Sequence, residues 1–299
     1  MRPPARSSGI RPLLLLIAPV WLIACACETR PPASDRPPAP RANVGAAAPR
    51  ERTIPSAFTV ATFNMNWGNV DLSDPVRVVA GSKADVVCMQ ETTPQAERAI
   101  RRDLSGRFPH MHFTGNVRYS SGFAILSRTP LSNVRLLEPK FGFFGTLLAD
   151  VELGARRVRV ASVHLEPVVP REGEGAGDIL ALFLKVEDLH LKEIGRIAPE
   201  LPEGAPAIVA GDLNSASFGS APRFLKSRGF VDSFAAVTEK PDAHTTWHWN
   251  HHGTDLRFRI DYVFHSPDMR TVGSRVVEAP SSDHALVVSR LEWADADAE

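Results

Sequence analysis

The short stretch Asp212-Leu213-Asn214 follows an apolar run, Ala207 to Gly211, and could take part in phosphate chemistry. A short apolar run that ends in polar residues predicts a strand buried on both faces. Because side chains two apart on a strand point the same way, Asp212 and Asn214 should share one face at its end. A carboxylate beside an amide can hold a metal-bound water or a phosphate oxygen. The alternative is an ordinary turn, since Asp and Asn often bond their own backbone after a strand.

Six further residues with chemically active side chains stand where a predicted strand begins or ends: Asn64, Glu91, His164, Asp261, Asp283 and His284. The first three follow apolar runs, whereas the last three precede them or begin them. In an antiparallel sheet the start of one strand lies beside the end of its neighbour. We therefore expect all of these side chains to meet at one edge of the sheets and to form a cleft.

The chemistry of such a cleft follows from its donor atoms. Carboxylate and amide oxygens are hard ligands that suit Mg²⁺ or Mn²⁺ with several retained waters. Cysteine ligands are absent from the set, which disfavours a structural zinc site. A histidine beside several aspartates can have its charge and tautomer fixed by one of them. A metal-neutralised phosphate, a positioned water and an Asp-His couple together indicate phosphoester hydrolysis.

The elements that must position these residues can be predicted from apolar periodicity. Strands are expected over residues 58–63, 85–91, 122–128, 145–153, 157–164, 207–212, 259–264 and 285–288. Helices are expected over residues 72–82, 94–104, 179–197 and 222–228. Strands outnumber helices and no internal repeat is visible, so one α/β domain over residues 57–299 fits better than two domains.

The first 56 residues have a different character. Residues 1–12 carry three arginines and no acid, and the apolar run from Leu13 to Ala24 is too short to span a bilayer permanently. Residues 1–24 therefore read as a signal peptide. The run ends Leu22-Ile23-Ala24-Cys25, which resembles the lipobox of bacterial lipoproteins and predicts lipidation of Cys25. The alternative is ordinary cleavage and secretion as a soluble protein.

Residues 25–56 are rich in Pro, Ala and Arg and are expected to act as a tether that holds the domain off the membrane. In either case we expect the protein to be exported, either anchored in the bacterial cell envelope or secreted. We expect it to act as a monomer.

Composition and net charge exclude few classes of function for this chain. Hydrophobic residues make up 43% and charged residues 23% of the chain, which is ordinary for a globular protein. Residues 57–299 hold 26 basic and 31 acidic residues, so no basic field indicates nucleic-acid binding. That observation weighs only lightly against a nuclease, because bound divalent cations would offset the local carboxylates.

Several short motifs occur in the order typical of one large family of enzymes. They are the segments 62–66, 90–91, 122–128, 163–165, 211–215, 259–262 and 282–284. Together they resemble the endonuclease/exonuclease/phosphatase superfamily over roughly residues 57–291. The resemblance implies a four-layer α/β sandwich, in which two packed sheets are flanked by helices.

The resemblance also implies roles for the metal-binding side of the site. Glu91 would be the principal metal carboxylate, with Asn64 beside it. Asp283 would be an additional ligand of the metal or of the phosphate site. The implied cofactor is Mg²⁺ or Mn²⁺.

On the side of the attacking water, the resemblance implies five further roles. His284 would act on the scissile phosphate or the water, and Asp261 would orient it. Asp212 would position or activate the water, Asn214 would hold a phosphate oxygen, and His164 would contact the phosphate. No covalent intermediate with the enzyme is expected, and the metal would spread the charge of the transition state.

Two departures from the family limit the choice of substrate. In the pancreatic-type deoxyribonuclease branch, a glutamate partners the histidine that corresponds to His164, whereas residues 118–121 here contain no acid. The abasic-site repair branch has a Tyr-bearing segment where this chain has residues 164–167. A role in DNA repair also fits poorly with export.

A cluster of aromatic and imidazole side chains lies between the last motifs: His244, Trp247, His248, Trp249, His251 and His252. His248 and His252 have the spacing of a helical zinc pair, but Asn250 and Gly253 favour a loop. We expect a loop on the cleft wall, whose tryptophans could stack on a base or contact a lipid headgroup.

Three hypotheses for function remain. The first is an exported phosphodiesterase that acts on nucleic acid. The second keeps the fold but acts on a phospholipid headgroup, as bacterial sphingomyelinases do, or on a phosphomonoester. The third is an inactive binding module on a lipid anchor, which the full set of acids and histidines argues against.

Overall fold

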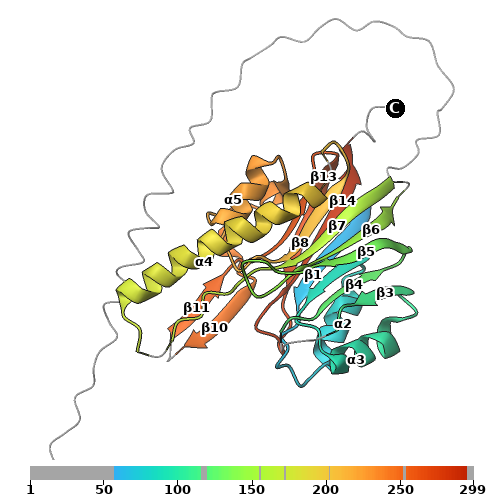
Figure 1. Ribbon diagram of the computed structural model, residues 1–299. Helices are drawn as coiled ribbons and strands as arrows, with labels where there is room; N and C mark the ends of the chain where they lie inside the picture. Colours follow the sequence, from blue (N-terminus) through green and yellow to red (C-terminus); the bar gives the residue numbers. More distant parts are fainter. Residues whose placement is uncertain are drawn as a thin grey trace, which may run out of the picture.

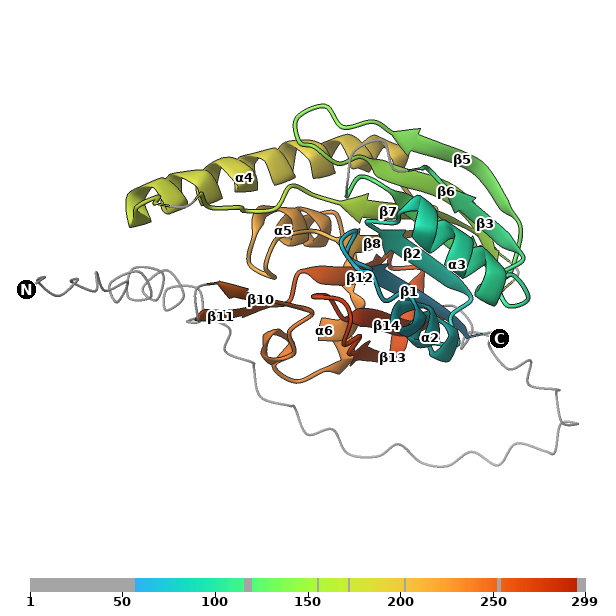
Figure 2. The same cartoon turned by 90° about the horizontal axis from the view of Figure 1, so that it is seen from below.

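The structure is a computed structural model that describes residues 57–115, 120–154, 156–171, 173–201, 203–251 and 254–294. Two six-stranded sheets pack face to face, and helices cover their outer faces (Figures 1 and 2). The predicted four-layer α/β sandwich is therefore confirmed. The segments expected to be signal peptide and tether, including Cys25, lie outside the described residues.

The first sheet has the strand order β13-β14-β1-β2-β4-β3. Its strands are β13 (Met269–Val277), β14 (Leu286–Trp293), β1 (Phe58–Asn64), β2 (Val86–Gln90), β4 (Phe123–Ser127) and β3 (His110–Phe113). β1 and β2 are parallel, and the other neighbouring pairs are antiparallel.

The second sheet has the strand order β5-β6-β7-β8-β12-β9. Its strands are β5 (Leu131–Leu137), β6 (Thr146–Leu153), β7 (Arg156–His164), β8 (Ala207–Asp212), β12 (Asp261–His265) and β9 (Val231–Asp232). β7 and β8 are parallel, whereas β8 and β12 are antiparallel. The end of β8 therefore lies beside the start of β12.

Helices α2 (Ser73–Gly81) and α3 (Pro94–Leu104) pack on the outer face of the first sheet. Helices α4 (Ala176–Ile197) and α5 (Ser220–Ser227) pack on the outer face of the second. α3 begins where Thr93 caps the N–H of Ala96, with proline in its first turn. Short helices occupy Ala198–Glu200 (η1), Ser233–Val237 (α6) and Pro241–Ala243 (η2). A separate hairpin pairs β10 (Trp247–His251) with β11 (Thr254–Phe258).

Sequence periodicity missed all four edge strands of the two large sheets, β3, β5, β9 and β13. Edge strands have one open side, so their residues are mixed in polarity and lack the continuous apolar run of a central strand. The loop expected around His248 was wrong, because this segment forms the β10–β11 hairpin. Turn-forming residues such as Asn250 and Gly253 are common at the tip of a hairpin as well as in loops.

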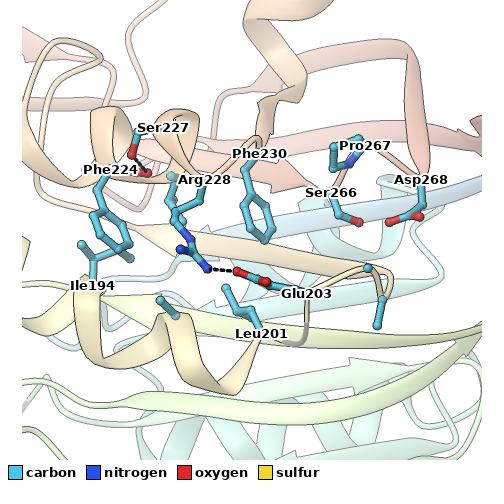
Figure 3. A pocket seen from close by; sticks show the side chains of 14 residues that line it. Ile194, Leu201, Glu203, Phe224, Ser227, Arg228, Phe230, Ser266, Pro267 and Asp268 are labelled. Carbon is cyan, nitrogen blue, oxygen red and sulfur yellow. Dashed lines mark hydrogen bonds and ion pairs between the residues drawn. The ribbon is translucent and has the colours of Figure 1, made fainter.

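None of the helices in the described residues has the length and apolar character needed to cross a membrane. A pocket of about 510 Å³ opens between the end of α4, α5 and the turn after β12 (Figure 3). Phe224 and Phe230 line it, and an ion pair of 2.9 Å joins Arg228 to Glu203 there. The pocket lies at the end of β12 opposite Asp261, so it is separate from the predicted cleft.

Candidate functional site

The central strands carry rows of side chains that face the opposite sheet. In β1 the row passes from Val60 in the inter-sheet core to Asn64, and in β8 it passes from Ile208 to Asp212. Since side chains alternate along a strand, Asn64 and Asp212 continue the inward-facing rows of their strands. The two sheets are thus held apart by apolar residues along most of their length and meet through polar residues at one end.

A neutral polar layer separates the apolar core from the ionisable residues. The Thr62 hydroxyl donates to Oε1 of Gln90, and Nε2 of Gln90 donates to the Ser162 hydroxyl at 3.0 Å. All three side chains are fully buried. Because buried polar groups are costly unless they are hydrogen-bonded, this layer fixes how the two sheets register at the edge of the site.

Three site residues stand side by side on neighbouring strands of the second sheet. Asp212 at the end of β8 pairs in register with His164 on β7 and with Asp261 on β12. Oδ2 of Asp212 accepts a hydrogen bond of 3.0 Å from Nδ2 of Asn64, across the gap between the sheets. The same oxygen lies 3.7 Å from Nε2 of both His164 and His284. Asp212 is therefore the point on which the site converges.

His284 is tied to Asp261 through its other ring nitrogen. Nδ1 lies 3.0 and 3.2 Å from the two carboxylate oxygens of Asp261. Burial lowers the pKa of His284, but the carboxylates of Asp261 and Asp212 outweigh it and raise the pKa. His284 is thus held as a proton carrier whose Nε2 faces Asp212. Burial in turn raises the pKa of Asp212, whose Oδ2 lies 3.7 Å from Nε2 of His284.

His164 has a different environment. Its ring stacks on Phe144 with 3.8 Å between ring centroids, and burial lowers its pKa to about 3. Nδ1 is buried and has no hydrogen-bond partner among the described residues. An unpaired N–H costs more than an unpaired lone pair, so the proton belongs on Nε2, which faces Glu91 and Asp212. The sequence has no acidic residue in 118–121 that could pair with His164. In this structure the ring of His164 is instead packed against Phe144.

Glu91 follows β2 in a left-handed backbone conformation with φ of 58°. Its carboxylate accepts hydrogen bonds from the backbone N–H of Trp67 at 2.9 Å and from Nδ2 of Asn64 at 3.2 Å. Burial raises the pKa of Glu91, and the nearby Asp283 carboxylate adds to the effect. Strained backbone at a non-glycine residue is a common feature of functional sites.

Asp283 belongs to the same cluster and is held by two side-chain donors. Nδ2 of Asn66 donates to its Oδ1 at 2.9 Å, and Nε1 of Trp247 donates to its Oδ2 at 3.1 Å. Trp247 also forms an isolated bridge with His284, which ties the β10–β11 hairpin to the site.

The residues present fit a divalent cation. Among the described residues, no lysine or arginine forms an ion pair with Glu91, Asp212 or Asp283, and only amide, backbone, indole and imidazole groups face them. Asp212 is buried and Glu91 and Asp283 are half-buried, so carboxylates without a lysine or arginine partner are costly here, and their oxygens are the ligands that Mg²⁺ and Mn²⁺ prefer. Asp212, Asp261 and His284 also bring three ligand atoms within 4.8 Å of one another. Because His284 is hydrogen-bonded to Asp261, we expect these three residues to transfer protons rather than to bind the metal.

Asn214 sits just beyond β8 in a left-handed conformation with φ of 46°. Its side-chain amide donates to the carbonyl of Leu165 at 2.8 Å, and its backbone N–H donates to Oδ1 of Asp212 at 2.8 Å. The residue before Asp212 is Gly211, where a Cβ atom would overlap the carbonyl of Val163. Gly211 therefore allows β7 and β8 to approach closely beneath the site.

Helix α4 fixes two loops at the site through two carboxylates, the half-buried Glu187 and the buried Glu193. Oε1 of Glu187 accepts a hydrogen bond of 3.0 Å from the Ser215 hydroxyl, and Oε2 accepts the backbone N–H of Ser220. Six residues later, Oε1 of Glu193 accepts the backbone N–H groups of residues 140, 141 and 142. The first loop follows Asn214, and the second leads to Phe144. α4 thus positions both sides of the site.

The structure brings together the eight predicted site residues: Asn64, Glu91, His164, Asp212, Asn214, Asp261, Asp283 and His284. Sequence reasoning assigned no role to Asn66, Phe144, Glu187 and Glu193, and it placed Trp247 on the cleft wall without its hydrogen bond to Asp283. Asn66, two residues after Asn64, could have been found from strand-end spacing. The two helix carboxylates could not, because their partners are backbone amides distant in sequence.

Comparisons with known proteins agree with this geometry. A profile of the endonuclease/exonuclease/phosphatase family matches residues 61–284. No significant match was found among curated protein sequences. Among solved structures, an endonuclease/exonuclease/phosphatase from Beutenbergia cavernae is 19% identical with a TM-score of 0.64, covering 80% of this chain and 72% of that one.

Two other solved structures share the fold. TDP2 from D. rerio, solved with a single-strand DNA product, is 16% identical with a TM-score of 0.62, covering 79% of this chain and 99% of that one. Sphingomyelinase C from Streptomyces griseocarneus is 18% identical with a TM-score of 0.55, covering 78% and 99%. The chain belongs to the endonuclease/exonuclease/phosphatase family, a family of phosphoester hydrolases.

Proposed function

We propose that this protein is an exported phosphodiesterase that depends on Mg²⁺ or Mn²⁺ and uses direct attack by water on phosphorus. The observation that carries the proposal is the convergence of Asn64, His164 and His284 on one oxygen of Asp212, at 3.0, 3.7 and 3.7 Å. Separations near 3.7 Å are too long for direct hydrogen bonds, so these groups can instead bond to a water or a phosphate oxygen that lies beside them.

The chain's own residues supply the steps. Asp212 accepts a proton from the attacking water, with its orientation fixed by Asn64 and by the backbone N–H of Asn214. Nε2–H of His164 donates to a non-bridging phosphate oxygen. His284, held by Asp261, donates a second hydrogen bond as negative charge builds on the phosphate. The bond from phosphorus to the leaving oxygen breaks as the bond to the water oxygen forms, and the leaving oxygen takes up a proton from solvent.

Glu91, Asn64 and Asp283 would hold the metal ion, which, when bound, neutralises charge on the phosphate. One N–H of the Asn214 side-chain amide donates to Leu165, so only the other, which lies 3.4 Å from Oδ2 of Asp212, would be left to hold a phosphate oxygen. Nucleic acid is the first candidate for the substrate, and a phospholipid headgroup or a phosphomonoester is the alternative. A phosphodiester substrate agrees with two of the structural relatives, TDP2 solved with a single-strand DNA product and a sphingomyelinase C.

An assay panel tests the reaction class. The protein is supplied with plasmid DNA, RNA, sphingomyelin vesicles, bis(p-nitrophenyl) phosphate and p-nitrophenyl phosphate, with Mg²⁺ or with a chelator. We expect hydrolysis of at least one diester that is lost with chelator and in His284→Ala. Activity that survives both treatments would refute the mechanism, and no turnover of any substrate would favour an inactive binding module.

We also propose that Cys25 is lipidated and anchors the protein in the cell envelope. The support is the apolar run that ends at Cys25 and the Pro/Ala-rich segment that follows it. Cys25→Ser should move the protein from the membrane fraction to the soluble fraction. If the unsubstituted protein is already in the soluble fraction, the prediction of a lipid anchor at Cys25 is wrong.

A further inference from the structure

Exposed hydrophobic side chains gather at the site end of the molecule, the end at which β1, β7 and β8 finish. Among the described residues, eleven large hydrophobic side chains are exposed, and eight of them lie on loops at this end or on the first turns of α4. We call these eight the apolar rim: Trp67, Val70, Phe141, Phe143, Val169, Leu180, Leu184 and Phe218. Exposed apolar residues are normally scattered singly, and a cluster marks an interaction surface.

The rim is built on the loops that carry the site. The backbone N–H of Trp67 binds Glu91, and Phe143 directly precedes Phe144, which stacks on His164. Phe218 follows Asn214 by four residues on the loop after β8. A molecule that contacts the rim is therefore presented to the phosphate site.

The first turns of α4 are apolar on every side. Residues 179–184 read Ile-Leu-Ala-Leu-Phe-Leu, and no residue from 176 to 185 is buried against the described part of the chain. Leu184 alone is 60% exposed. Figure 2 shows these turns reaching beyond the second sheet, at the same end as the β10–β11 hairpin. A helix that is hydrophobic all round is normally buried in protein or in lipid.

The charge of the surrounding segments argues against a polyanionic partner. The described residues of segments 65–72, 138–145, 165–185 and 213–219 include three basic and five acidic side chains. The basic residues are Lys140, Arg171 and Lys185, and the acidic ones are Asp71, Glu138, Glu166, Glu174 and Asp178. Proteins that bind nucleic acid cluster Lys and Arg on the contact face. An apolar rim without excess positive charge suits a zwitterionic lipid surface better.

The predicted anchor is compatible with such a contact. β1 begins at Phe58, at the end of the molecule opposite the site. Residues 25–56 have a contour length of about 105 Å at ~3.3 Å per residue, whereas α4 with 22 residues is only about 33 Å long. The segment is therefore long enough for the site end to turn toward the membrane that holds the anchor.

We propose that the apolar rim docks on a zwitterionic phospholipid bilayer, and that the substrate is the phosphodiester headgroup of a lipid in that bilayer. The identity of the substrate rests on the proposed phosphodiesterase activity, whereas the docking does not. The first turns of α4 enter the interface, and the loops with Trp67 and Phe143 bring the headgroup to the site.

Vesicle flotation tests the docking. The predicted mature chain, residues 25–299, carries Cys25→Ser so that no acyl chain contributes, and is mixed with phosphatidylcholine vesicles that contain sphingomyelin. We compare it with Leu180→Glu/Leu184→Glu and with a matched control, Leu191→Glu, on the same helix outside the rim. Because burying leucine in lipid is favourable and a carboxylate there is not, the double variant should bind at least about tenfold more weakly. The control should bind as the parent does.

The outcomes separate docking from chemistry. In each chain, release of the lipid headgroup is measured beside hydrolysis of soluble bis(p-nitrophenyl) phosphate. We expect the double variant to lose most headgroup release while it keeps the soluble activity. Absence of vesicle binding, equal loss in the control, or tighter binding to single-stranded DNA than to vesicles would overturn the docking. Vesicle binding without hydrolysis of any diester would instead refute the proposed function.

Discussion

Glu193→Gln should disturb the site from a distance. In the structure one carboxylate oxygen of Glu193 accepts three backbone N–H groups, from Lys140, Phe141 and Gly142, and the other accepts Arg196 at 3.0 Å. Although burial raises the pKa of Glu193, these backbone hydrogen bonds outweigh it and lower the pKa. The ionised carboxylate of Glu193 thus holds the loop that leads to Phe144 in place, and we call this contact the clamp.

The size of the effect follows from the number of hydrogen bonds. Replacing a charged acceptor with a neutral one costs about 1 kcal/mol for each hydrogen bond. Three donors share one oxygen in Glu193, so we expect a loss of about 2 kcal/mol in the free energy of unfolding rather than the full sum. A matched control is Asp188→Asn, an exposed carboxylate on the same helix that pairs with Lys192. It should change stability by less than about 0.5 kcal/mol.

Urea denaturation and enzyme kinetics measure the two consequences. Because the loop places Phe144 against His164, kcat on a soluble diester should fall by about tenfold, which corresponds to roughly 1.4 kcal/mol of transition-state stabilisation. A folded-state pKa below the unfolded value of 4.5 means that Glu193 stabilises the fold above that pH. The difference between parent and variant should therefore shrink as the pH falls below 4.5. Equal urea midpoints for Glu193→Gln and Asp188→Asn, with unchanged kcat, would refute the clamp.

Two further substitutions probe the strands that carry the site. Gly211→Ala places a Cβ against the backbone of β7 at a residue with φ of 154°, and should cost about 2–4 kcal/mol in urea denaturation. Gly273→Ala, which has open space around it, is the control, and equal effects would contradict the close approach. Asp261→Asn removes a carboxylate that raises the pKa of His284, so the alkaline limb of a kcat–pH profile should move to lower pH. An unmoved limb would show that protonation of His284 is not required.

Local sequence patterns were sufficient where a residue's position on a strand decides its place. The run Ala207 to Asp212 has the apolar continuity of a central strand, and its last residue necessarily ends an inward-facing row. The same holds for Asn64 on β1 and His164 on β7. Alternation along a strand is a short-range property, so the gathering of polar ends at one edge could be predicted.

Long-range contacts could not be predicted in the same way. The stacking of Phe144 on His164 depends on a loop that α4 holds through Glu193, 49 residues later in the chain. Nothing in the local sequence marks which side chain will accept a distant backbone amide. The β10–β11 hairpin was missed for a related reason, because turn-forming residues do not reveal whether the flanking segments pair with each other.

The Mg²⁺ dependence of diester hydrolysis tests the central claim most directly. Initial rates on bis(p-nitrophenyl) phosphate are measured while Mg²⁺ is titrated into metal-free protein, for the parent chain and for Glu91→Gln. Because Glu91 is a half-buried carboxylate without a lysine or arginine partner among the described residues, we expect saturable activation in the parent. In the variant, half-maximal activation should need at least about tenfold more Mg²⁺. Full activity in metal-free protein, or the same midpoint in both chains, would contradict a metal-dependent phosphodiesterase centred on Glu91.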